Sequence, residues 1–353
     1  MSGFVKLGDL THIRTGKLDA NASSENGQYP FFTCSKEPLR IASYSYDCEC
    51  VLVAGNGDLN VKYYDGKFDA YQRTYIIESA DKRKLLVKYL YFFLDIYVEV
   101  LRTQSIGGVI KYIKLSNLTD ALIPLPSIKR QAEIIECLEK CNTLIDTRQR
   151  EIALIEQTVK SRFIELFGDP VTNPYGWQQL TVNDVCVSIV RGPFGSALKK
   201  EFFVPPSDTT YKVYEQKHAI QKSSTIGTYY VTAEKYNELR RFECHSGDIL
   251  MSCSGTMGEL YQLPAGCERG IINQALCKFT LNERILPIAF LAYMRETIGN
   301  LETKGSGIQN IAAVSYVKAM PINLPPMRVQ EQFAAFVEQT DKSKLCGRME
   351  VAA

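Results

Sequence analysis

The distribution of apolar and polar residues predicts two blocks of mixed α and β structure. Short runs of strand-favouring residues, each bounded by Gly, Asn or Asp, lie at residues 51–54, 74–78, 248–252 and 275–280. Apolar residues at helical spacing predict longer helices over residues 85–101 and 288–301. We therefore expect an α/β (α+β) fold in which the two halves of the chain contain similar elements.

The strongest periodic signal lies between the two blocks. No Gly or Pro occurs from Ser127 to Phe167; Ser127 is a good N-cap, and Gly168 with Pro170 is a firm stop. About 40 residues form a helix roughly 60 Å long. Its apolar positions advance by alternating steps of four and three, which is typical of a coiled-coil seam. The seam residues are Ile134, Leu138, Cys141, Ile145, Ile152, Ile155 and Val159, with Arg148 and Arg162 interrupting two positions.

A second helix is predicted after the second block. It starts at Pro326-Met327 and presents an apolar stripe of Phe333, Phe336, Val337 and Thr340. We expect it to continue only to about Leu345, because the tail from Cys346-Gly347 should break it. A helix about half as long as the first leaves part of the first seam uncovered, and burial of apolar surface, at about 25 cal/mol per Å², favours a partner there.

The chain contains an internal repeat. Residues 108–131 match residues 307–330 without a gap: each copy has a Gly, an apolar strand-like piece, a Leu-Pro stop and a helix start with a Gln. Weaker likeness joins residues 51–57 to 249–255, 70–73 to 272–275, and 7–10 to 182–185. The second copy is longer, and we place most of its extra residues in 202–222, whose polar composition is typical of an inserted loop.

The repeat divides the chain into four parts. We expect one globular block at residues 1–126, the central spacer helix at 127–168, a second block at 169–325, and a shorter spacer helix with a tail at 326–353. Two similar blocks, each followed by a helix, can close around a pseudo-twofold axis with antiparallel helices. Because half-sites one duplex turn apart, roughly 34–36 Å, face the same side of DNA, such a rod suits two separated DNA half-sites.

Together these features carry a family resemblance. The duplicated Gly-to-Gln pattern, the run Phe-Ile-Glu-Leu-Phe-Gly-Asp-Pro at 163–170, the following Asn173-Pro174-Tyr175-Gly176-Trp177 and the two-block layout resemble the specificity (S) subunit of type I restriction-modification systems over about residues 3–345. The resemblance implies two target recognition domains, each reading one half of a split DNA sequence. It also implies a subunit that is not an enzyme by itself.

The resemblance places the partners and cofactors outside this chain. Double-stranded DNA, two modification (methyltransferase) subunits and restriction (endonuclease and translocase) subunits are the implied partners. S-adenosylmethionine, ATP and Mg would bind those subunits, and adenine would be the methylated base. The uncovered seam would dock a modification subunit or another copy of this chain; alternatively, the chain is a truncated product.

Composition and charge narrow the class of protein. The chain has 353 residues, 45% apolar and 23% charged, which is typical of a globular protein, and its net charge of +2 requires any DNA-binding face to gather its cations on one side. No apolar run approaches the ~18–20 residues of a membrane span and no secretory leader is evident, so we expect a cytoplasmic protein. The 11 Cys and 3 His show no zinc-like spacing, which indicates reduced, mostly buried thiols and no metal.

Candidate DNA contacts are polar residues in loops of equivalent position. Gln72 and Arg73 in the first copy, with Asn273 and Gln274 in the second, can make bidentate contacts to adenine or guanine edges. Two Gly-containing loops could bring backbone amides and polar groups to a phosphate; they supply Gly107, Gly108 and Lys111, and Ser306, Gly307 and Asn310. Further candidates are Asn56, in a tight Asn-Gly turn, and the basic residues Arg191, Lys199, Lys200, Arg240 and Arg241. For each, a solvated side chain or a structural turn is the alternative.

Two other classes of protein stay open. A coiled-coil adaptor with two similar protein-binding domains is favoured if Lys111, Arg191, Lys199 and Lys200 lie on opposite sides of the molecule. The run Asn173-Pro174-Tyr175 is similar to the Asn/Asp-Pro-Pro-Tyr/Phe loop of amino-methyltransferases. It lacks one Pro and an upstream Gly-rich loop, so we interpret it as a turn into the second block and expect no binding of S-adenosylmethionine.

Overall fold

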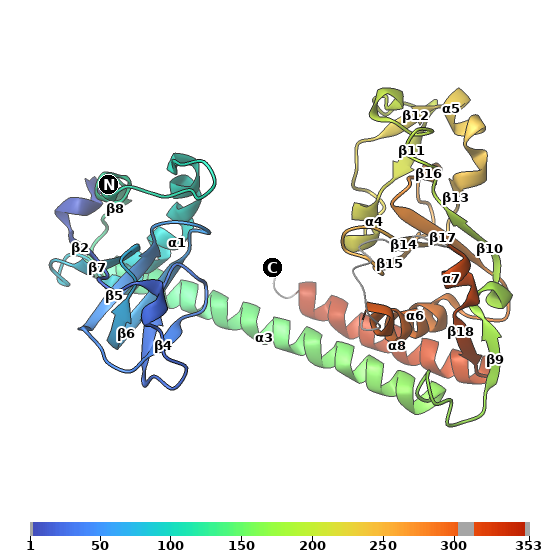
Figure 1. Ribbon diagram of the computed structural model, residues 1–353, viewed down its shortest axis with the longest axis horizontal. Coiled ribbons are helices and arrows are strands. Elements are labelled where there is room, and N and C mark those ends of the chain that lie inside the picture. Colours follow the sequence, from blue (N-terminus) through green and yellow to red (C-terminus); the bar gives the residue numbers. More distant parts are fainter. Residues whose placement is uncertain (1–2, 303–313, 350–353) are drawn as a thin grey trace. The chain divides into compact units, whose positions relative to one another are not determined.

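The computed structural model describes residues 3–302 and 314–349 (Figure 1). The chain divides into two compact units, Met1–Thr147 and Arg148–Ala353, and each is described by itself. Helix α3, Ile128–Phe167, continues from unit 1 into unit 2. Its bounds agree with the start at Ser127 and the stop at Gly168 that the sequence predicts.

Unit 1 is built on a six-stranded sheet with the order β2-β7-β5-β6-β3-β4. Neighbouring strands are antiparallel except β3 and β6, which pair in parallel, Phe32 beside Ala70. Helix α1, Val87–Gln104, buries Leu90, Leu94 and Leu101 in the core with strand residues such as Val51 and Ile77. The strands are β2 (Thr11–Thr15), β3 (Tyr29–Phe32), β4 (Leu39–Ile41), β5 (Tyr46–Ala54), β6 (Val61–Ala70) and β7 (Thr74–Ser79). The short elements are β1 (Phe4–Lys6) paired with β8 (Leu122–Pro124), the 3-10 helices η1 (Leu7–Asp9) and η2 (Ala20–Ala22), and α2 (Leu115–Thr119).

Unit 2 contains two four-stranded sheets, with the orders β10-β17-β14-β15 and β12-β11-β16-β13. Its strands are β9 (Gln178–Thr181), β10 (Cys186–Arg191), β11 (Thr210–Tyr214), β12 (Tyr230–Thr232), β13 (Glu243–Cys244), β14 (Ile249–Ser252), β15 (Leu260–Gln262), β16 (Gly270–Ile272), β17 (Leu276–Leu281) and β18 (Pro321–Leu324). Its helices are η3 (Val182–Val185), η4 (Lys200–Phe202), α4 (Gln216–Ile220), α5 (Ala233–Glu238), η5 (Arg240–Phe242), α6 (Pro287–Glu302), α7 (Val314–Ala319) and α8 (Met327–Met349).

The two units share one topology. In unit 1 the long strands β5 and β6 pair along most of their length. In unit 2 each of these strands is interrupted: β13 and β14 together correspond to β5, and β15 and β16 together correspond to β6, so that β14 pairs with β15 and β13 with β16. The parallel pairing is also repeated, because β11 lies beside β16 as β3 lies beside the end of β6. The strands predicted at 51–54, 74–78, 248–252 and 275–280 correspond to β5, β7, β14 and β17.

A buried glutamine makes the same three hydrogen bonds in both units. In unit 1 the Gln131 Oε1 accepts from the Leu86 N–H at 2.9 Å, and its Nε2 donates to the carbonyls of Lys84 and Pro126. In unit 2 the Gln330 Oε1 accepts from the Leu286 N–H at 2.9 Å, and its Nε2 donates to the carbonyls of Arg284 and Pro325. Because buried polar groups need partners, each glutamine ties a spacer helix to the segment that enters α1 or α6. The repeat seen in the sequence is therefore a repeat of packing.

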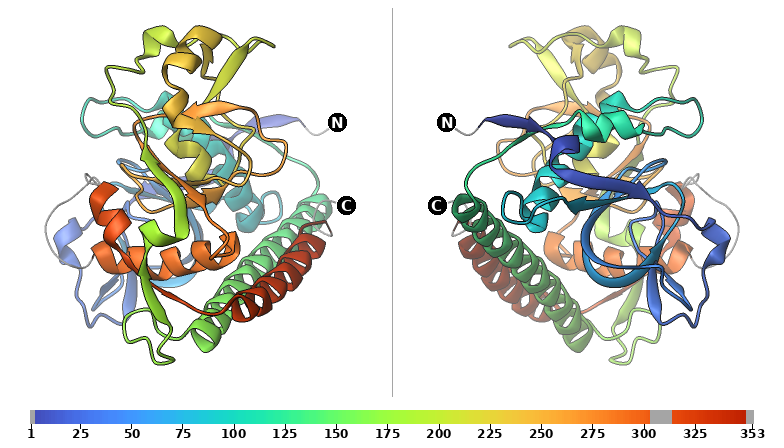
Figure 2. Two further views of the ribbon diagram at one scale, coloured as in Figure 1. Left: turned by 90° about the vertical axis from the view of Figure 1, so that its right-hand side faces the viewer. Right: turned by 90° about the vertical axis from the view of Figure 1, so that its left-hand side faces the viewer.

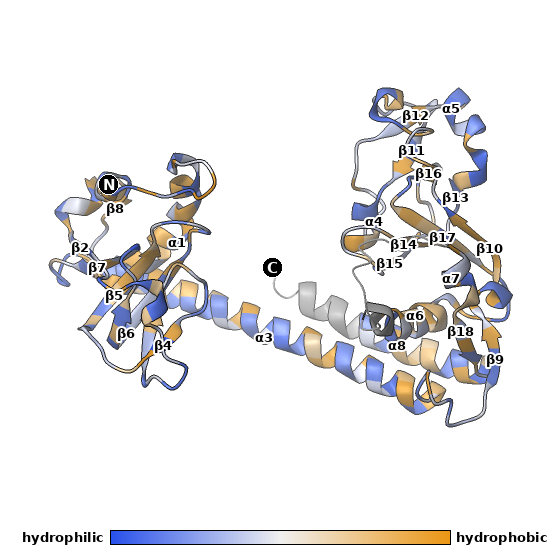
Figure 3. Cartoon of the chain, in the orientation of Figure 1, coloured by the Kyte–Doolittle hydropathy of each residue, from blue (hydrophilic) through white to orange (hydrophobic). Residues whose placement is uncertain are grey.

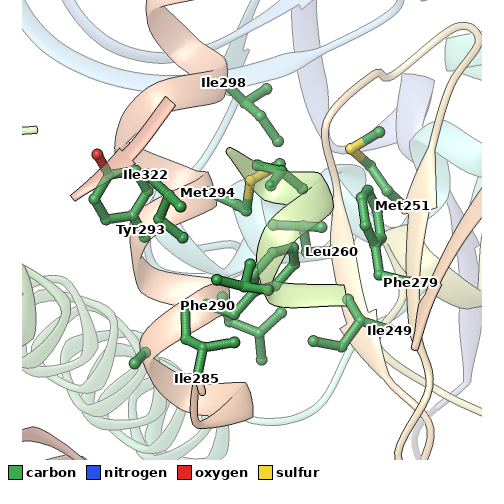
Figure 4. Close-up of a cluster of buried hydrophobic side chains, with 14 of the residues drawn as sticks. Ile249, Met251, Leu260, Phe279, Ile285, Phe290, Tyr293, Met294, Ile298 and Ile322 are labelled. Atoms are coloured by element: carbon green, nitrogen blue, oxygen red, sulfur yellow. The ribbon is translucent and has the colours of Figure 1, made fainter. Parts of the chain in front are cut away.

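The core of unit 2 brings together the sheet β10-β17-β14-β15 and side chains of helices α3, α6, α7 and α8. Met251 and Phe279 from β14 and β17 pack against Phe290 and Met294 of α6 and against Ile322 of β18 (Figure 4). All four residues of β14 are buried, in contrast to the alternating pattern of a strand with one wet face. Figure 3 shows the same strands as largely hydrophobic.

Within unit 2, α8 packs antiparallel to the last turns of α3 (Figures 1 and 2). The Phe333 ring lies 5.7 Å from that of Phe163 and 5.4 Å from that of Phe167, edge to face in both cases. Arg162, one of the residues that interrupt the seam, places its guanidinium 5.8 Å from the Phe336 ring. Val159 packs against this cluster, in which Val337 is buried.

The rest of the predicted seam is covered unevenly. Ile134 packs against the core of unit 1 and Leu138 is half-buried, while Ile152 and Ile155 are half-buried near the other end of the helix. Of the seam residues between them, Cys141 is exposed and Ile145 is 49% exposed. Outside the seam, Leu144 and Leu154 are 56% and 63% exposed. The helix therefore has apolar surface that the described part of this chain leaves open.

Two expectations about local structure are wrong. Residues 202–222 are not an inserted loop, because they contain β11 and α4, and the extra length lies mainly between β11 and β13. Helix α8 does not end at Leu345 but continues to Met349. A glycine in a helix costs only about 1 kcal/mol, so Gly347 does not end it. The predicted turn at Asn173-Pro174-Tyr175 is confirmed, with a left-handed φ of 47° at Asn173.

Cysteine burial is mixed in the described residues. Cys50, Cys244, Cys253 and Cys277 are buried, four others are half-buried, and Cys137 and Cys141 are exposed on α3. No group of three or more His, Cys, Asp or Glu side chains in this part of the chain is arranged to hold a metal ion. Nor does any helix within residues 3–302 and 314–349 have the length and hydrophobicity to cross a membrane.

Candidate nucleic-acid interface

In unit 1, three turns meet at Gly55, just after β5. Its N–H donates to the Arg73 carbonyl at 2.8 Å, and its own carbonyl accepts from the Ile113 N–H at 2.9 Å. The next turn residue, Gly57, donates its N–H to the Lys111 carbonyl at 2.9 Å. A Cβ at residue 55 would lie 2.3 Å from the Arg73 carbonyl oxygen, so only glycine permits this approach.

These turns bring four candidate residues to one edge of the sheet. The unit 1 polar edge consists of Asn56, Gln72, Arg73 and Lys111. Gln72, Arg73 and Lys111 are exposed and Asn56 is half-buried. Among the described residues, neither Arg73 nor Lys111 takes part in an ion pair. Two cations and two amide side chains are therefore available on one surface.

The loop that carries Lys111 is a tight hairpin. Ile106 and Tyr112 exchange both backbone hydrogen bonds, at 3.0 and 2.9 Å, and Gly107 has a left-handed φ of 117°. Tyr75, whose pKa burial raises, anchors its base by donating to the Ile113 carbonyl at 3.2 Å. Gly108 is exposed, and Val109 beside it is fully exposed, a feature that sequence reasoning missed.

Unit 2 has a matching turn after β16. The Leu276 N–H donates to the Asn273 carbonyl at 3.1 Å, just as the Thr74 N–H donates to Tyr71 at 2.8 Å in unit 1. Gly192 donates its N–H to the Leu276 carbonyl at 3.0 Å, and a Cβ there would lie 1.8 Å from the Asn273 oxygen. The turn that follows β5 in unit 1 is also repeated after β14 in unit 2, with φ 70° at Gly57 and 61° at Gly255.

The candidates of unit 2 have different roles in this turn. Gln274 is exposed at its tip. Asn273 is half-buried, and its Oδ1 accepts from the Ala275 N–H at 3.1 Å, so its side chain supports the turn. Arg191 donates from Nε to the Gln274 carbonyl at 3.4 Å. A hydrogen bond with Cys277 and then the Arg191 charge hold the pKa of Cys253 below its ordinary value against the effect of burial.

Sequence reasoning missed Gln216 in this region. It is the first residue of α4, and its side-chain Oε1 accepts from the Ser254 hydroxyl at 3.2 Å. The only signal in the sequence was a lone glutamine in a segment interpreted as a loop. The unit 2 polar edge consists of Arg191, Gln216, Ser254, Asn273 and Gln274.

Several candidates lie elsewhere. Lys199 and Lys200 are exposed at η4, where Lys199 is 3.7 Å from Glu201, and Arg240 and Arg241 are exposed at η5. Ser306, Gly307 and Asn310 lie outside the described residues. The unit 1 candidates therefore gather at one edge, whereas in unit 2 only Arg191, Asn273 and Gln274 do.

The comparison with known proteins agrees with this duplicated architecture. Residues 2–157 and 174–346 match the family model of the type I restriction modification DNA specificity domain. The chain therefore belongs to this family, as its residue patterns suggested.

The type I restriction enzyme EcoDI specificity subunit of Escherichia coli is 40% identical over 158 residues. That alignment covers 44% of this chain and 34% of the relative, so the chain matches about a third of that protein's length.

Two solved structures share the fold. A type I restriction-modification S subunit from M. genitalium superposes with a TM-score of 0.59 at 15% identity, covering 99% of this chain and 91% of the other. A chain from a study of assembly and conformational transition of the type I R-M system has a TM-score of 0.55 at 15% identity, covering 100% and 94%. The two-unit α/β fold predicted from the repeat is confirmed.

Proposed function

We propose that this chain is the DNA-specificity subunit of a type I restriction-modification complex and that each unit reads one half of a bipartite target. The observation that supports this most is the duplicated polar edge, which two units of one topology hold with matching backbone hydrogen bonds. A repeated scaffold with different side chains at its turns suits recognition of two different short sequences.

The chemistry of the edges fits duplex DNA. Arg bonds in bidentate fashion to guanine O6 and N7, and Gln bonds to adenine N6 and N7 in the major groove. Lys111 and the exposed backbone of Gly107 and Gly108 suit contacts to phosphate, which fix position rather than sequence. We assign base contacts to Gln72, Arg73 and Gln274, and a supporting role to Asn273.

In this proposal the chain is a scaffold without a catalytic centre. Modification subunits dock on the exposed apolar stretch of α3, at Leu144, Ile145 and Leu154, and restriction subunits join through them. S-adenosylmethionine, ATP and Mg bind to those subunits. Equilibrium dialysis of the isolated chain with S-adenosylmethionine should show no binding.

Salt-dependent DNA binding tests the proposal. The assembled complex should bind a preferred duplex in gel-shift titrations, and the affinity should fall steeply as salt rises because phosphate contacts release counterions. Lys111→Ala should reduce the slope of log K against log salt by about 1, while Lys84→Ala, which changes an exposed lysine beyond the end of β7 opposite Arg73, should not change it. Equal, salt-insensitive binding to every duplex would end the proposal.

The second candidate is a protein-binding adaptor. The exposed Leu144, Ile145 and Leu154 favour it, because an open apolar stripe on a helix is a common protein-binding surface. It predicts partner capture that Ile145→Lys abolishes, together with no preference among DNA sequences.

A further inference from the structure

We propose that Gln216 reads an adenine in the half-site of unit 2 and that Ser254 orients its amide for this contact. The inference rests on the proposed DNA-reading function and adds a residue that determines specificity. It starts from the equivalence of two strand ends, one in each unit.

Gln216 occupies a position that the topology defines. In unit 2 the Asn273 N–H donates to the carbonyl of Tyr214, the last residue of β11, at 3.0 Å. In unit 1 the Tyr71 N–H donates to the carbonyl of Phe32, the last residue of β3, at 2.9 Å. Counting two residues onward from each strand end, Gln216 corresponds to Cys34. Both residues therefore leave the sheet beside the turn that carries Gln274 or Gln72.

The equivalent positions have exchanged large and small side chains. In unit 1 the second residue after the strand is Cys34, whose thiol turns inward to the Arg73 carbonyl at 3.6 Å, and Arg73 projects from the neighbouring turn. In unit 2 the turn residue is Ala275, and the long side chain belongs to Gln216. Each polar edge thus holds one long hydrogen-bonding side chain beside a small one, but on opposite segments.

The amide of Gln216 has a defined orientation. The Ser254 hydroxyl donates to Oε1 at 3.2 Å, and Nε2 lies 3.1 Å from where a Cβ on Gly255 would be. Gly255 adopts φ 61°, so the absence of a side chain leaves room for the amide over the turn. Within the described residues, Nε2 has no protein acceptor.

Helix α4 holds Gln216 in place. The buried His218 accepts from the Glu215 N–H through Nδ1 at 2.9 Å, and its Nε2 is 2.8 Å from the Ile226 carbonyl. The helix packs against β14 and β15 (Figure 1). A side chain on a rigid support loses less entropy when it binds.

This orientation matches adenine. An amide oxygen has two lone pairs, so Oε1 can accept from adenine N6 while it still accepts from Ser254, and Nε2 can donate to N7. Cytosine presents only the N4 donor at this edge of the base pair, so Oε1 could accept from it but Nε2 would have no acceptor. The geometry therefore favours adenine over cytosine.

Selection from a random duplex library tests the assignment. The full chain, assembled with its partner subunits, should enrich a bipartite motif. Gln216→Ala should lose roughly 5- to 150-fold of its discrimination at one adenine of one half-site. Gln216→Glu, which can only accept, should shift that position towards cytosine. Ser254→Ala should weaken the preference at the same position without moving it.

The control and the outcomes separate this inference from the proposed function. Gln221→Ala, at the exposed far end of α4, should leave every position unchanged, and thermal unfolding of each variant checks that unit 2 is folded. If wild type enriches a motif that Gln216→Ala and Gln216→Glu both leave intact, Gln216 is not a reader although the chain is. If wild type enriches no motif, the proposed function fails as well.

Discussion

The two units hold their polar edges with the same backbone contacts but present different chemistry. Unit 1 offers the exposed cations Arg73 and Lys111, whereas unit 2 offers the amides of Gln216 and Gln274 and keeps Arg191 bonded at its turn. The backbone scaffold of the edge is therefore separable from the side chains that it presents. Duplication preserves the first and leaves the second free to change.

The units also differ in how their central strands are built. In unit 1, β5 and β6 are continuous, while unit 2 interrupts both and buries ion pairs around the breaks, such as Lys278 with Asp248 at 3.1 Å. Lys212, 1% exposed, pairs at 2.6 Å with Glu268, whose side chain is 52% exposed. Unit 2 therefore depends more on buried polar groups than unit 1 does.

The first prediction, with the largest change in stability, tests whether the two repeated glutamines stabilise their units equally. Gln131→Ala and Gln330→Ala should each lower the free energy of unfolding by about 3 kcal/mol, because each leaves buried backbone groups unsatisfied. Denaturant unfolding measures this. The exposed helix residues Gln149→Ala and Gln332→Ala are the controls. If only one of the two substitutions lowered the free energy of unfolding, the two glutamines would not have equivalent structural roles.

The next effect concerns the glycines where two segments touch. Gly16→Ala puts a Cβ 2.1 Å from the Ala70 oxygen, and Gly192→Ala puts one 1.8 Å from the Asn273 oxygen. Each should cost about 2 kcal/mol through backbone displacement. Thermal unfolding of Gly3→Ala and Gly195→Ala, which have nothing within 4 Å, should match wild type. Tolerance of either close-contact substitution would show that its turn is not held as described.

A smaller effect separates the two half-sites. Gln72 and Gln274 are identical residues at equivalent turn positions. Each change to Ala should cost about 1 kcal/mol of base discrimination, at corresponding positions of opposite half-sites. Motif selection with each single variant measures this. If both variants altered the same half-site, the assignment of one half to each unit would be wrong.

The smallest effect is a dependence on pH confined to unit 2. Burial, with a further contribution from Lys212, lowers the pKa of His218 below its ordinary value of 6.5 despite the hydrogen bonds with Glu215 and Ile226. The unfolded chain then binds the proton more readily, so stability is full above pH 6.5 and declines as pH falls through that value. Thermal unfolding between pH 8 and pH 5 should show this decline. It should disappear in His218→Gln and persist in His12→Gln, which changes an exposed residue of unit 1.

Local signals in the sequence determined where the central helix begins and ends and where several strands lie. The N-cap Ser127 and the stop at Gly168 bounded α3, and strand-favouring runs located β5, β7, β14 and β17, because capping and residue periodicity act over a few neighbours. The repeat also placed Gln72 and Gln274 in matching turns. Both turns then appear in the structure with the same carbonyl hydrogen bond.

Only the tertiary structure decided which residues share an edge. Strand β11 lies in a polar segment that looks like a loop, and its parallel pairing with β16 joins residues far apart in the chain. No local pattern encodes such a pairing, because its stability comes from burial and hydrogen bonds across the sheet. For the same reason the sequence did not reveal Gln216 as a site residue. It also did not reveal which residues of α3 are buried, because that depends on how α8 and the two cores pack against the helix.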